Sequence, residues 1–277
     1  MIAFDDTALL EVPLVGLGYR QPIADWIMGQ PDGVDCIEVT AEHFFAGGER
    51  ELATLAEMFP VSVHGLGLSL GTPGPLDLAT LKQFKRVADC AEARWISEHL
   101  AFTKTTDVDL GHLNPVPLND SSLRTMIEHS RQLMDYCERP LLLENITSQL
   151  RLPEEIAETE FINLLCDISG ARLLLDVTNL FINSRNHQFD PVSWLKQIEP
   201  DFIRQIHIVG YSYSDGIWHD RHNSMIQDEL FELATTVVRY APIEAIIIER
   251  DGSFPEIPAL EQELQRLEAV CETARCG

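Results

Sequence analysis

The sequence predicts an α/β fold, a single (β/α)8 TIM barrel that spans residues 1–277. Eight short runs rich in apolar and β-branched residues recur along the chain, and amphipathic stretches separate them. Continuous apolar runs of this length are typical of parallel strands that are buried on both faces. No Pro/Gly-rich linker or change of composition divides the chain, and its length is close to the roughly 250 residues of a typical barrel of this kind.

The expected strands and helices can be followed in order. Leu81, Phe84 and Val87 recur at helical spacing after the third strand, and Asn119 offers an N-cap for a later helix. The strands are expected at 12–18, 35–41, 60–65, 94–100, 140–146, 171–177, 202–210 and 243–251. The clearest helices are expected at 78–91, 119–138, 226–240 and 257–273.

The alternative fold, an open doubly wound sheet, lacks its usual signature. Gly16 and Gly18 are not followed by the third glycine of a dinucleotide-binding fingerprint. The glycine-rich stretch 65–71 has no phosphate-loop lysine. We interpret these glycines as turn residues.

The charge balance excludes several classes of partner. The chain has 44 acidic and 20 basic residues, a formal net charge of −24. Such a surface repels nucleic acid and anionic membranes, so we expect neither as a partner. The N-terminal sequence lacks the features of a secretory signal, no long apolar run occurs, and the six cysteines form no CxxC pair. These features predict a cytoplasmic protein with reduced thiols.

Candidate metal ligands stand at the ends of the expected strands, where a barrel places its active site. Because these ends meet in one mouth, several carboxylates would crowd there, and bound cations would neutralise them. We therefore favour a polynuclear metal centre over a structural hydrogen-bond network. Ligation by His, Asp and Glu without Cys suits zinc, non-haem iron or manganese. The candidates are His64, His99, Glu144, Asp176, His207 and Glu249, with Asp220 and His222 in the loop after the seventh strand.

The order of these ligands resembles the three-metal barrel of zinc AP endonucleases. That resemblance implies a first ion on His64, His99 and Glu144. It implies a second ion on Glu144, Asp176, His207 and Glu249.

The third ion of that scheme departs from the nuclease pattern. It would take Asp220, His222 and the residue three beyond Asp176. The nucleases have a histidine at this last position, whereas this chain has Asn179. The asparagine and the charge of −24 both weaken a zinc nuclease interpretation.

A second resemblance covers almost the whole chain. The motifs GLGYR (16–20), IEVTAEHFF (37–45), SVHGLGLSLG (62–71), SEHLAF (97–102), LLLENI (141–146), LLLDVTNLFINSRNH (173–187) and IHIVGYS (206–212) carry it. In these motifs the chain is similar to the DUF692 family, the multinuclear non-haem iron-dependent oxidative enzymes. The pair Asp176 and Asn179 is that family's form of the third-metal motif.

This resemblance implies oxidative modification of a cysteine in a ribosomally synthesised precursor peptide. It implies two or three iron ions in mixed Fe2+/Fe3+ states, O2 as cosubstrate, and a small partner protein that presents the peptide. The LSLGTPGPLD loop (68–77) and the SRNH segment (184–187) resemble the type that excises the β-carbon of a C-terminal cysteine in 3-thiaglutamate biosynthesis. The alternative within the family is the methanobactin type, which forms an oxazolone and a thioamide.

Two alternatives come from other classes: a zinc-dependent nuclease-like or isomerase-like enzyme, and a non-catalytic metal-binding scaffold. The family resemblance implies catalytic roles for Glu144, Asp176 and His207. Other polar residues near the expected mouth are weaker candidates, and ordinary loop hydrogen bonding is their alternative interpretation. Possible contacts to the metal ligands or to substrate are Glu42, Asn145 and Asn186, and possible ligands for a peptide carboxylate are Arg185 and Arg221.

Overall fold

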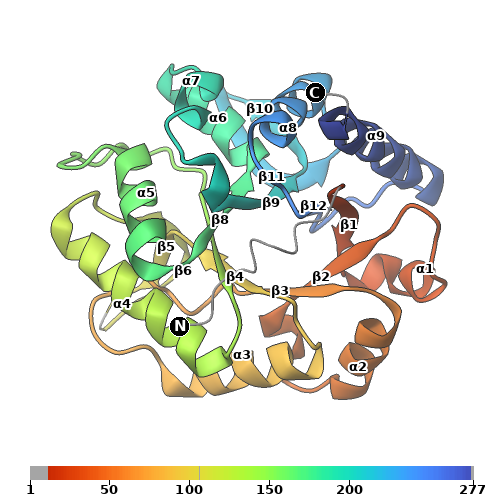
Figure 1. Ribbon diagram of the computed structural model, residues 1–277, viewed down its shortest axis with the longest axis horizontal. Helices are drawn as coiled ribbons and strands as arrows, with labels where there is room; N and C mark the ends of the chain where they lie inside the picture. Colours follow the sequence, from red (N-terminus) through yellow and green to blue (C-terminus); the bar gives the residue numbers. More distant parts are fainter. Residues whose placement is uncertain (1–11, 106, 276–277) are drawn as a thin grey trace.

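The computed structural model describes residues 12–105 and 107–275, and its parallel strands close into a barrel (Figure 1). Each barrel strand lies inside one of the eight expected runs, so the predicted fold class is confirmed. In order around the barrel the strands are β1 (Leu14–Gly18), β2 (Cys36–Thr40), β3 (Val61–His64), β4 (Ile96–His99), β7 (Leu141–Glu144), β8 (Arg172–Asp176), β9 (Ile203–Ile208) and β12 (Ala245–Ile248), which pairs with β1.

Helices surround the strands and cover their outer faces (Figure 1). The side chain of Asp77 caps the helix that begins at Leu78, and Asn119 caps the helix that begins at Asp120 by accepting from the backbone N–H groups of Ser121 and Ser122. No helix within residues 12–105 and 107–275 is long and apolar enough to cross a membrane. The longer helices are α2 (Glu49–Met58), α3 (Leu78–Cys90), α4 (Asp120–Cys137), α5 (Glu158–Ser169), α6 (Val177–His187), α8 (Asp228–Tyr240) and α9 (Ile257–Arg275). The short ones are η1 (Gln21–Ile23), α1 (Ala24–Met28), η2 (Ala41–Phe44), α7 (Pro191–Leu195) and η3 (Pro200–Phe202).

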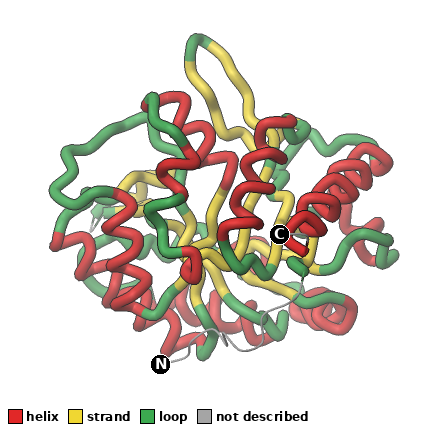
Figure 2. The backbone as a smooth tube through the Cα atoms, turned by 45° about the horizontal axis from the view of Figure 1, so that its top comes forward, coloured by secondary structure: helices red, strands yellow, loops and turns green. Residues whose placement is uncertain are grey.

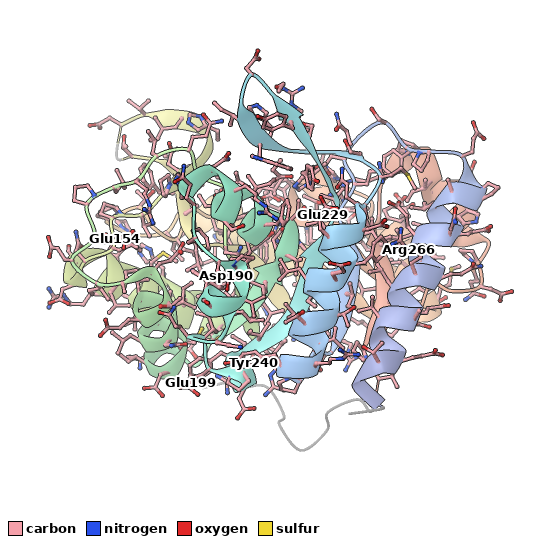
Figure 3. All side chains as sticks on the ribbon, turned by 90° about the horizontal axis from the view of Figure 1, so that it is seen from above. Glu154, Asp190, Glu199, Glu229, Tyr240 and Arg266 are labelled. Carbon is pink, nitrogen blue, oxygen red and sulfur yellow. The ribbon has the colours of Figure 1, made fainter. Side chains whose placement is uncertain are left out.

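Two antiparallel hairpins extend the barrel on its C-terminal side. β5 (Ala101–Lys104) pairs with β6 (Asp109–Pro115), and β10 (Gly210–Ser214) pairs with β11 (Ile217–Ser224). The second hairpin rises well clear of the barrel (Figures 2 and 3). The sequence predicted a loop here, and the structure has a hairpin instead. The reason is the Asp215-Gly216 turn, in which both residues have positive φ, as a tight hairpin requires.

The barrel interior is built in layers, because successive side chains of a strand point to opposite faces. Apolar side chains fill the N-terminal end, among them Trp95, Leu142 and Leu174. Above them lies a polar layer, in which Gln205 and Ser62 both donate to Glu38. The candidate metal ligands form the next layer, at the C-terminal end of the strands.

Candidate metal centre

The strand register places candidate ligands side by side. His99 of β4 lies opposite Glu144 of β7, and Asp176 of β8 lies opposite His207 of β9. All four are buried. Parallel strands with this pairing bring residues distant in sequence into one layer, which is why the site needs the closed barrel.

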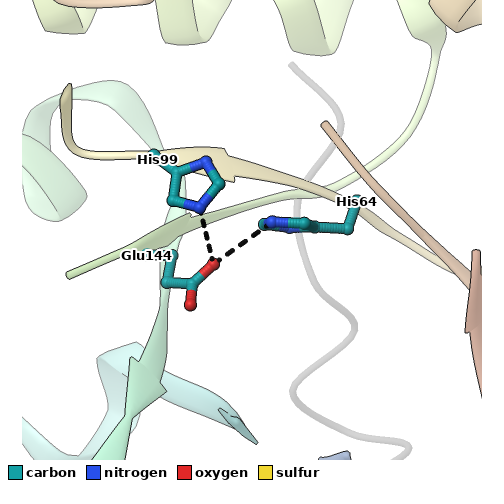
Figure 4. A group of neighbouring side chains, drawn as sticks. All are labelled: His64, His99 and Glu144. Carbon is teal, nitrogen blue, oxygen red and sulfur yellow. Dashed lines mark ion pairs between the residues drawn. The ribbon is translucent and has the colours of Figure 1, made fainter. Parts of the chain in front are cut away.

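The first group consists of His64, His99 and Glu144 (Figure 4). The Nε2 atoms of both histidines lie 3.4 Å from Oε2 of Glu144. His64 Nε2 and Glu144 Oε2 are buried and make no hydrogen bond within the described residues. Buried polar atoms are rarely left without a partner. Unpartnered donor atoms that converge on one point fit a bound cation.

Side chains outside the first group orient its two histidines. His64 Nδ1 lies 2.8 Å from the Ser97 hydroxyl, and His99 Nδ1 lies 3.2 Å from Glu98 Oε1. Each contact leaves Nε2 directed at the centre. Such outer partners fix the ring orientation and basicity of metal-binding histidines. Ser97 and Glu98 were not among the predicted site residues.

The second group consists of Glu144, Asp176, His207 and Glu249, whose ligand atoms lie within 4.8 Å of one another. His207 Nδ1 lies 3.2 Å from Glu144 Oε1 and 3.1 Å from Glu249 Oε2. Asp176 Oδ2 is buried and, within the described residues, has no hydrogen-bond partner. Glu144 therefore faces the first group with one oxygen and the second group with the other.

Glu38 is a further part of this centre that the sequence analysis missed. Its Oε1 lies 2.8 Å from His207 Nε2, and its Oε2 accepts from Gln205 at 2.7 Å. The contact fixes His207 with Nδ1 toward the other ligands. The available signal was a carboxylate at an inward position of an otherwise apolar strand.

A third group forms around His222 on β11. Its Nε2 lies 2.8 Å from Asp220 Oδ2, and its Nδ1 lies 3.1 Å from Asp251 Oδ2. His222, Glu249 and Asp251 have ligand atoms close enough to hold an ion together. Asp251, which was not predicted, also accepts from Arg20 Nε at 2.9 Å.

Asn179 lies three residues beyond Asp176 and lines the same cavity as Asp220 and His222. This metal cavity has a volume of about 490 Å³. The Asn179 side chain accepts from the Thr147 hydroxyl and donates to the Asn145 carbonyl at 3.1 Å. Its amide therefore also holds the segment that follows Glu144.

One face of α6 fixes that segment. Asn183 donates to the carbonyl of Ile146 at 2.9 Å and accepts from the N–H of Ser148 at 3.0 Å. His187 Nε2 lies 2.6 Å from the Ser148 carbonyl. Asn179, Asn183 and His187 follow one another at intervals of four, so they share one side of the helix. The DVTNLFINSRNH sequence thus binds the chain next to Glu144.

Replacement of Asn183 by Ala tests this contact. We expect a loss of about 1–3 kcal/mol in the free energy of unfolding, because backbone groups of Ile146 and Ser148 lose their partner. Hydrogen exchange should accelerate at residues 146–150. Asn163→Ala is a matched control, since Asn163 makes a similar pair of bonds to Gln197 and Glu199. Equal exchange at 146–150 in both variants would contradict the assignment.

The remaining predicted residues lie around the centre. Asn145 bonds the backbone of Asp176 in both directions, at 3.0 and 2.9 Å. Asn186 does the same for Trp218, at 3.0 and 3.1 Å, and so ties β11 to α6. Neither these two residues nor the other three are among those that line the metal cavity. Glu42 accepts from the N–H groups of Leu66 and Gly67, Arg185 stacks over Phe181, and Arg221 is exposed on β11.

The electrostatics of the centre balance carboxylates against histidines. Burial lowers the pKa of His207, but Glu38, Glu144 and Glu249 outweigh burial and raise it well above its ordinary value. Burial likewise opposes the rise in His99, where Glu144 and Glu98 bring the pKa to about 9. Without metal, protonated His99 and His207 supply positive charge that the carboxylates require, whereas burial lowers the pKa of His64.

The pKa values of Asp176 and His222 are raised as well. Burial, and then the repulsion of Glu144, raise the pKa of Asp176 well above its ordinary value. Burial lowers the pKa of His222, but the neighbouring carboxylates, Glu249 first, raise it well above the usual range. Metal ions bound here must displace these protons.

These pKa shifts predict opposite pH responses for metal binding and for the stability of the metal-free protein. Metal affinity should rise from pH 6.5 to about 9, the pKa of His99, with net proton release. The raised pKa values mean that the folded metal-free protein binds more protons than the unfolded chain, so its stability should fall over the same range. Metal titrations with an indicator dye and denaturant unfolding measure the two. A metal affinity that is flat with pH would contradict the expectation.

The fold belongs to a known class of barrel. The structure superposes on the xylose isomerase domain protein from Planctomyces limnophilus with a TM-score of 0.63 and 11% identity, covering 96% of this chain and 99% of that one. Endonuclease IV from Thermus thermophilus gives 0.60 and 13%, covering 93% and 100%. At these identities the likeness shows the fold alone: a xylose isomerase-like and endonuclease IV-like TIM barrel.

The family is shown by sequence. Residues 14–272 match the family described as "RiPP precursor modification enzyme MbnB/TglH/ChrH". The UPF0276 protein of Caulobacter vibrioides is 32% identical over 268 residues, 95% of each chain. That of Chromobacterium violaceum is 33% identical over 258 residues, 92% of this chain and 94% of the relative. The chain belongs to the MbnB/TglH/ChrH family of enzymes that modify precursors of ribosomally synthesised peptides. The resemblance to this family that the sequence motifs indicated is therefore confirmed.

Proposed function

We propose that this protein uses iron and O2 to oxidise a cysteine of a ribosomally synthesised peptide, and that it excises the β-carbon of a C-terminal cysteine. The observation that carries the proposal is Glu144, which presents one oxygen to each of two buried ligand groups. A carboxylate in this position can bridge two metal ions. Family membership supports the peptide substrate.

The donor set is compatible with iron. Its ligands are imidazole nitrogens and carboxylate oxygens, and no cysteine of the described residues belongs to the three groups. Such a set suits non-haem iron, zinc or manganese. Because the set contains no soft sulfur ligand, the thiol of the substrate could supply one. When bound, iron supplies one-electron chemistry with dioxygen.

The residues of the chain have distinct parts in this proposal. His64 and His99 would hold the first ion, and Asp176, His207 and Glu249 would hold the second, with Glu144 shared between the two. Asp220, His222 and Asn179 form the third position, with Asp251 as an additional carboxylate. Ser97, Glu98 and Glu38 orient the histidines. The protein therefore fixes geometry and charge.

The atoms and electrons of the excision balance with dioxygen as the only oxidant. Removal of one CH2 unit from the cysteine, with both atoms of O2, gives one molecule of formic acid. The sulfur stays on the peptide, now bonded to the α-carbon. Because the β-carbon and the α-carbon of the cysteine together give up the four electrons that reduce O2, no external reductant is needed. A separate small partner protein presents the peptide.

The test combines metal analysis with turnover. Protein purified without oxygen should contain two or three irons per chain. With the partner protein and a peptide ending in cysteine, it should consume O2 and release an equal amount of formate, and the peptide should lose one methylene unit. An oxazolone product would indicate the other family chemistry. Stoichiometric zinc with cleavage of abasic DNA would contradict the proposal, and absence of O2 consumption would indicate a scaffold.

A further inference from the structure

The segment after Glu144 separates two cavities. Thr147 and Gln149 line the metal cavity, whereas Ser148 and Leu150 line a second one, the side cavity. Ile146 borders both. Alternate residues of one segment thus line different cavities. The side cavity is therefore a direct neighbour of the metal cavity.

The side cavity is predominantly apolar. Val116, Phe161 and Ile162 form its buried wall, and Leu150 stands at its edge with 64% of its surface exposed. Its volume is about 110 Å³. A cavity that holds a single water molecule has about 10–15 Å³ on the same scale, so the side cavity has room for a branched aliphatic side chain. An apolar hollow open to solvent at an active site is a common form of ligand subsite.

Negative charge borders the side cavity. Glu154 and Glu158 stand at its edge, and a shallower hollow continues past them to Asp190. Glu154 and Asp190 both lie on the face of the molecule shown in Figure 3. Arg151 lies among these three carboxylates. Burial, and the nearby charge of Glu154, raise the pKa of Glu158, so a further cation at this border would relieve repulsion.

We propose that the side cavity binds a Leu or Ile side chain of the substrate peptide, and that Glu154 and Glu158 bind a Lys or Arg beside it. The inference rests on the proposed function, because the occupant is the peptide whose cysteine enters the metal cavity. The two cavities are separated only by this one segment, and an extended peptide rises about 3.3 Å per residue. The apolar residue is therefore expected within the four residues that precede the cysteine.

The probes are fluorescein-labelled decapeptides that end in cysteine, with Leu at one of the four preceding positions and Lys beside it. Binding is measured by anisotropy to the anaerobic iron(II)-loaded protein in the presence of its partner protein. One register should bind about tenfold more tightly than its Leu→Ala counterpart, the loss expected for one unburied leucine. Replacement of the peptide Lys by Glu should weaken binding further.

Two protein variants test the site itself. Leu152 lines the side cavity from an exposed segment, so Leu152→Trp should fill the space and abolish the preference for Leu over Ala. Leu78→Trp, at a residue 58% exposed on α3, is the control and should keep the preference. Glu154→Lys should reverse the preference for Lys over Glu, and Glu92→Lys, at another exposed glutamate, should not.

The outcomes separate this inference from the proposed function. The cysteine's contact with iron is followed independently, as a change in the absorption spectrum that a Cys→Ser peptide does not produce. If that change occurs but Leu and Ala peptides bind equally at every register, the side-cavity assignment is wrong and the proposed function stands. If the Leu preference responds to Leu152→Trp but no peptide changes the spectrum, the side cavity stands and the proposed function fails.

Discussion

Glu144→Ala should abolish turnover and reduce the iron content of both principal positions. Each Glu144 oxygen faces a different ligand group, so one substitution removes a ligand from both. The deletion also leaves His64, His99 and His207 around a space without its central carboxylate. We expect at least a hundredfold loss of activity, by analogy with other deletions of groups that act in the transition state. Metal analysis and formate release measure the two effects.

The conservative variant separates charge from shape. Glu144→Gln keeps the size of the side chain but removes the negative charge that balances the cations, so nearly the same loss is expected. Glu57→Ala, at an exposed glutamate on α2, should retain iron and activity. Full iron content and turnover in Glu144→Ala would show that the proposed ligand scheme is wrong.

The fold could be predicted because its strands are buried on both faces. LLLE and AIII, for example, have buried residues throughout, and such runs stand out without any knowledge of their partners. The hairpins were missed because their residues are half-exposed and polar. The Asp215-Gly216 turn was nevertheless a local signal for one of them. The remaining hairpin geometry depends on contacts such as the one between Asn186 and Trp218.

Within the candidate centre, the sequence could predict only the ligands that stand at the ends of strands. His64, His99, Glu144, Asp176 and His207 each end a strand or lie one residue before its end. Glu38 lies one layer deeper, where only the alternation of inward and outward side chains would reveal it. Asp251 depends on long-range geometry: it meets His222 of β11 and Arg20 beyond β1 only after the chain has closed. The spacing of these residues in the sequence therefore does not predict their contact.

Glu38→Gln should weaken metal binding at the second position about 10–100-fold, the usual cost of losing an outer partner of a metal-binding histidine. His207 loses the carboxylate that lies 2.8 Å from its Nε2, although the amide oxygen can still accept that hydrogen bond. The proximity of His207 lowers the pKa of Glu38 to about 2, against the effect of burial, so the wild-type partner is charged at neutral pH.

The effect of Glu38→Gln should be confined to the position that His207 serves. Ser97→Ala is the matched control, because Ser97 contacts His64 of the first group and should affect that position instead. Stepwise metal titrations that resolve the two affinities distinguish the variants. If Glu38→Gln lowered both affinities equally, Glu38 would act on the barrel as a whole. A selective loss would identify it as the residue that positions His207, and through His207 the second metal ion.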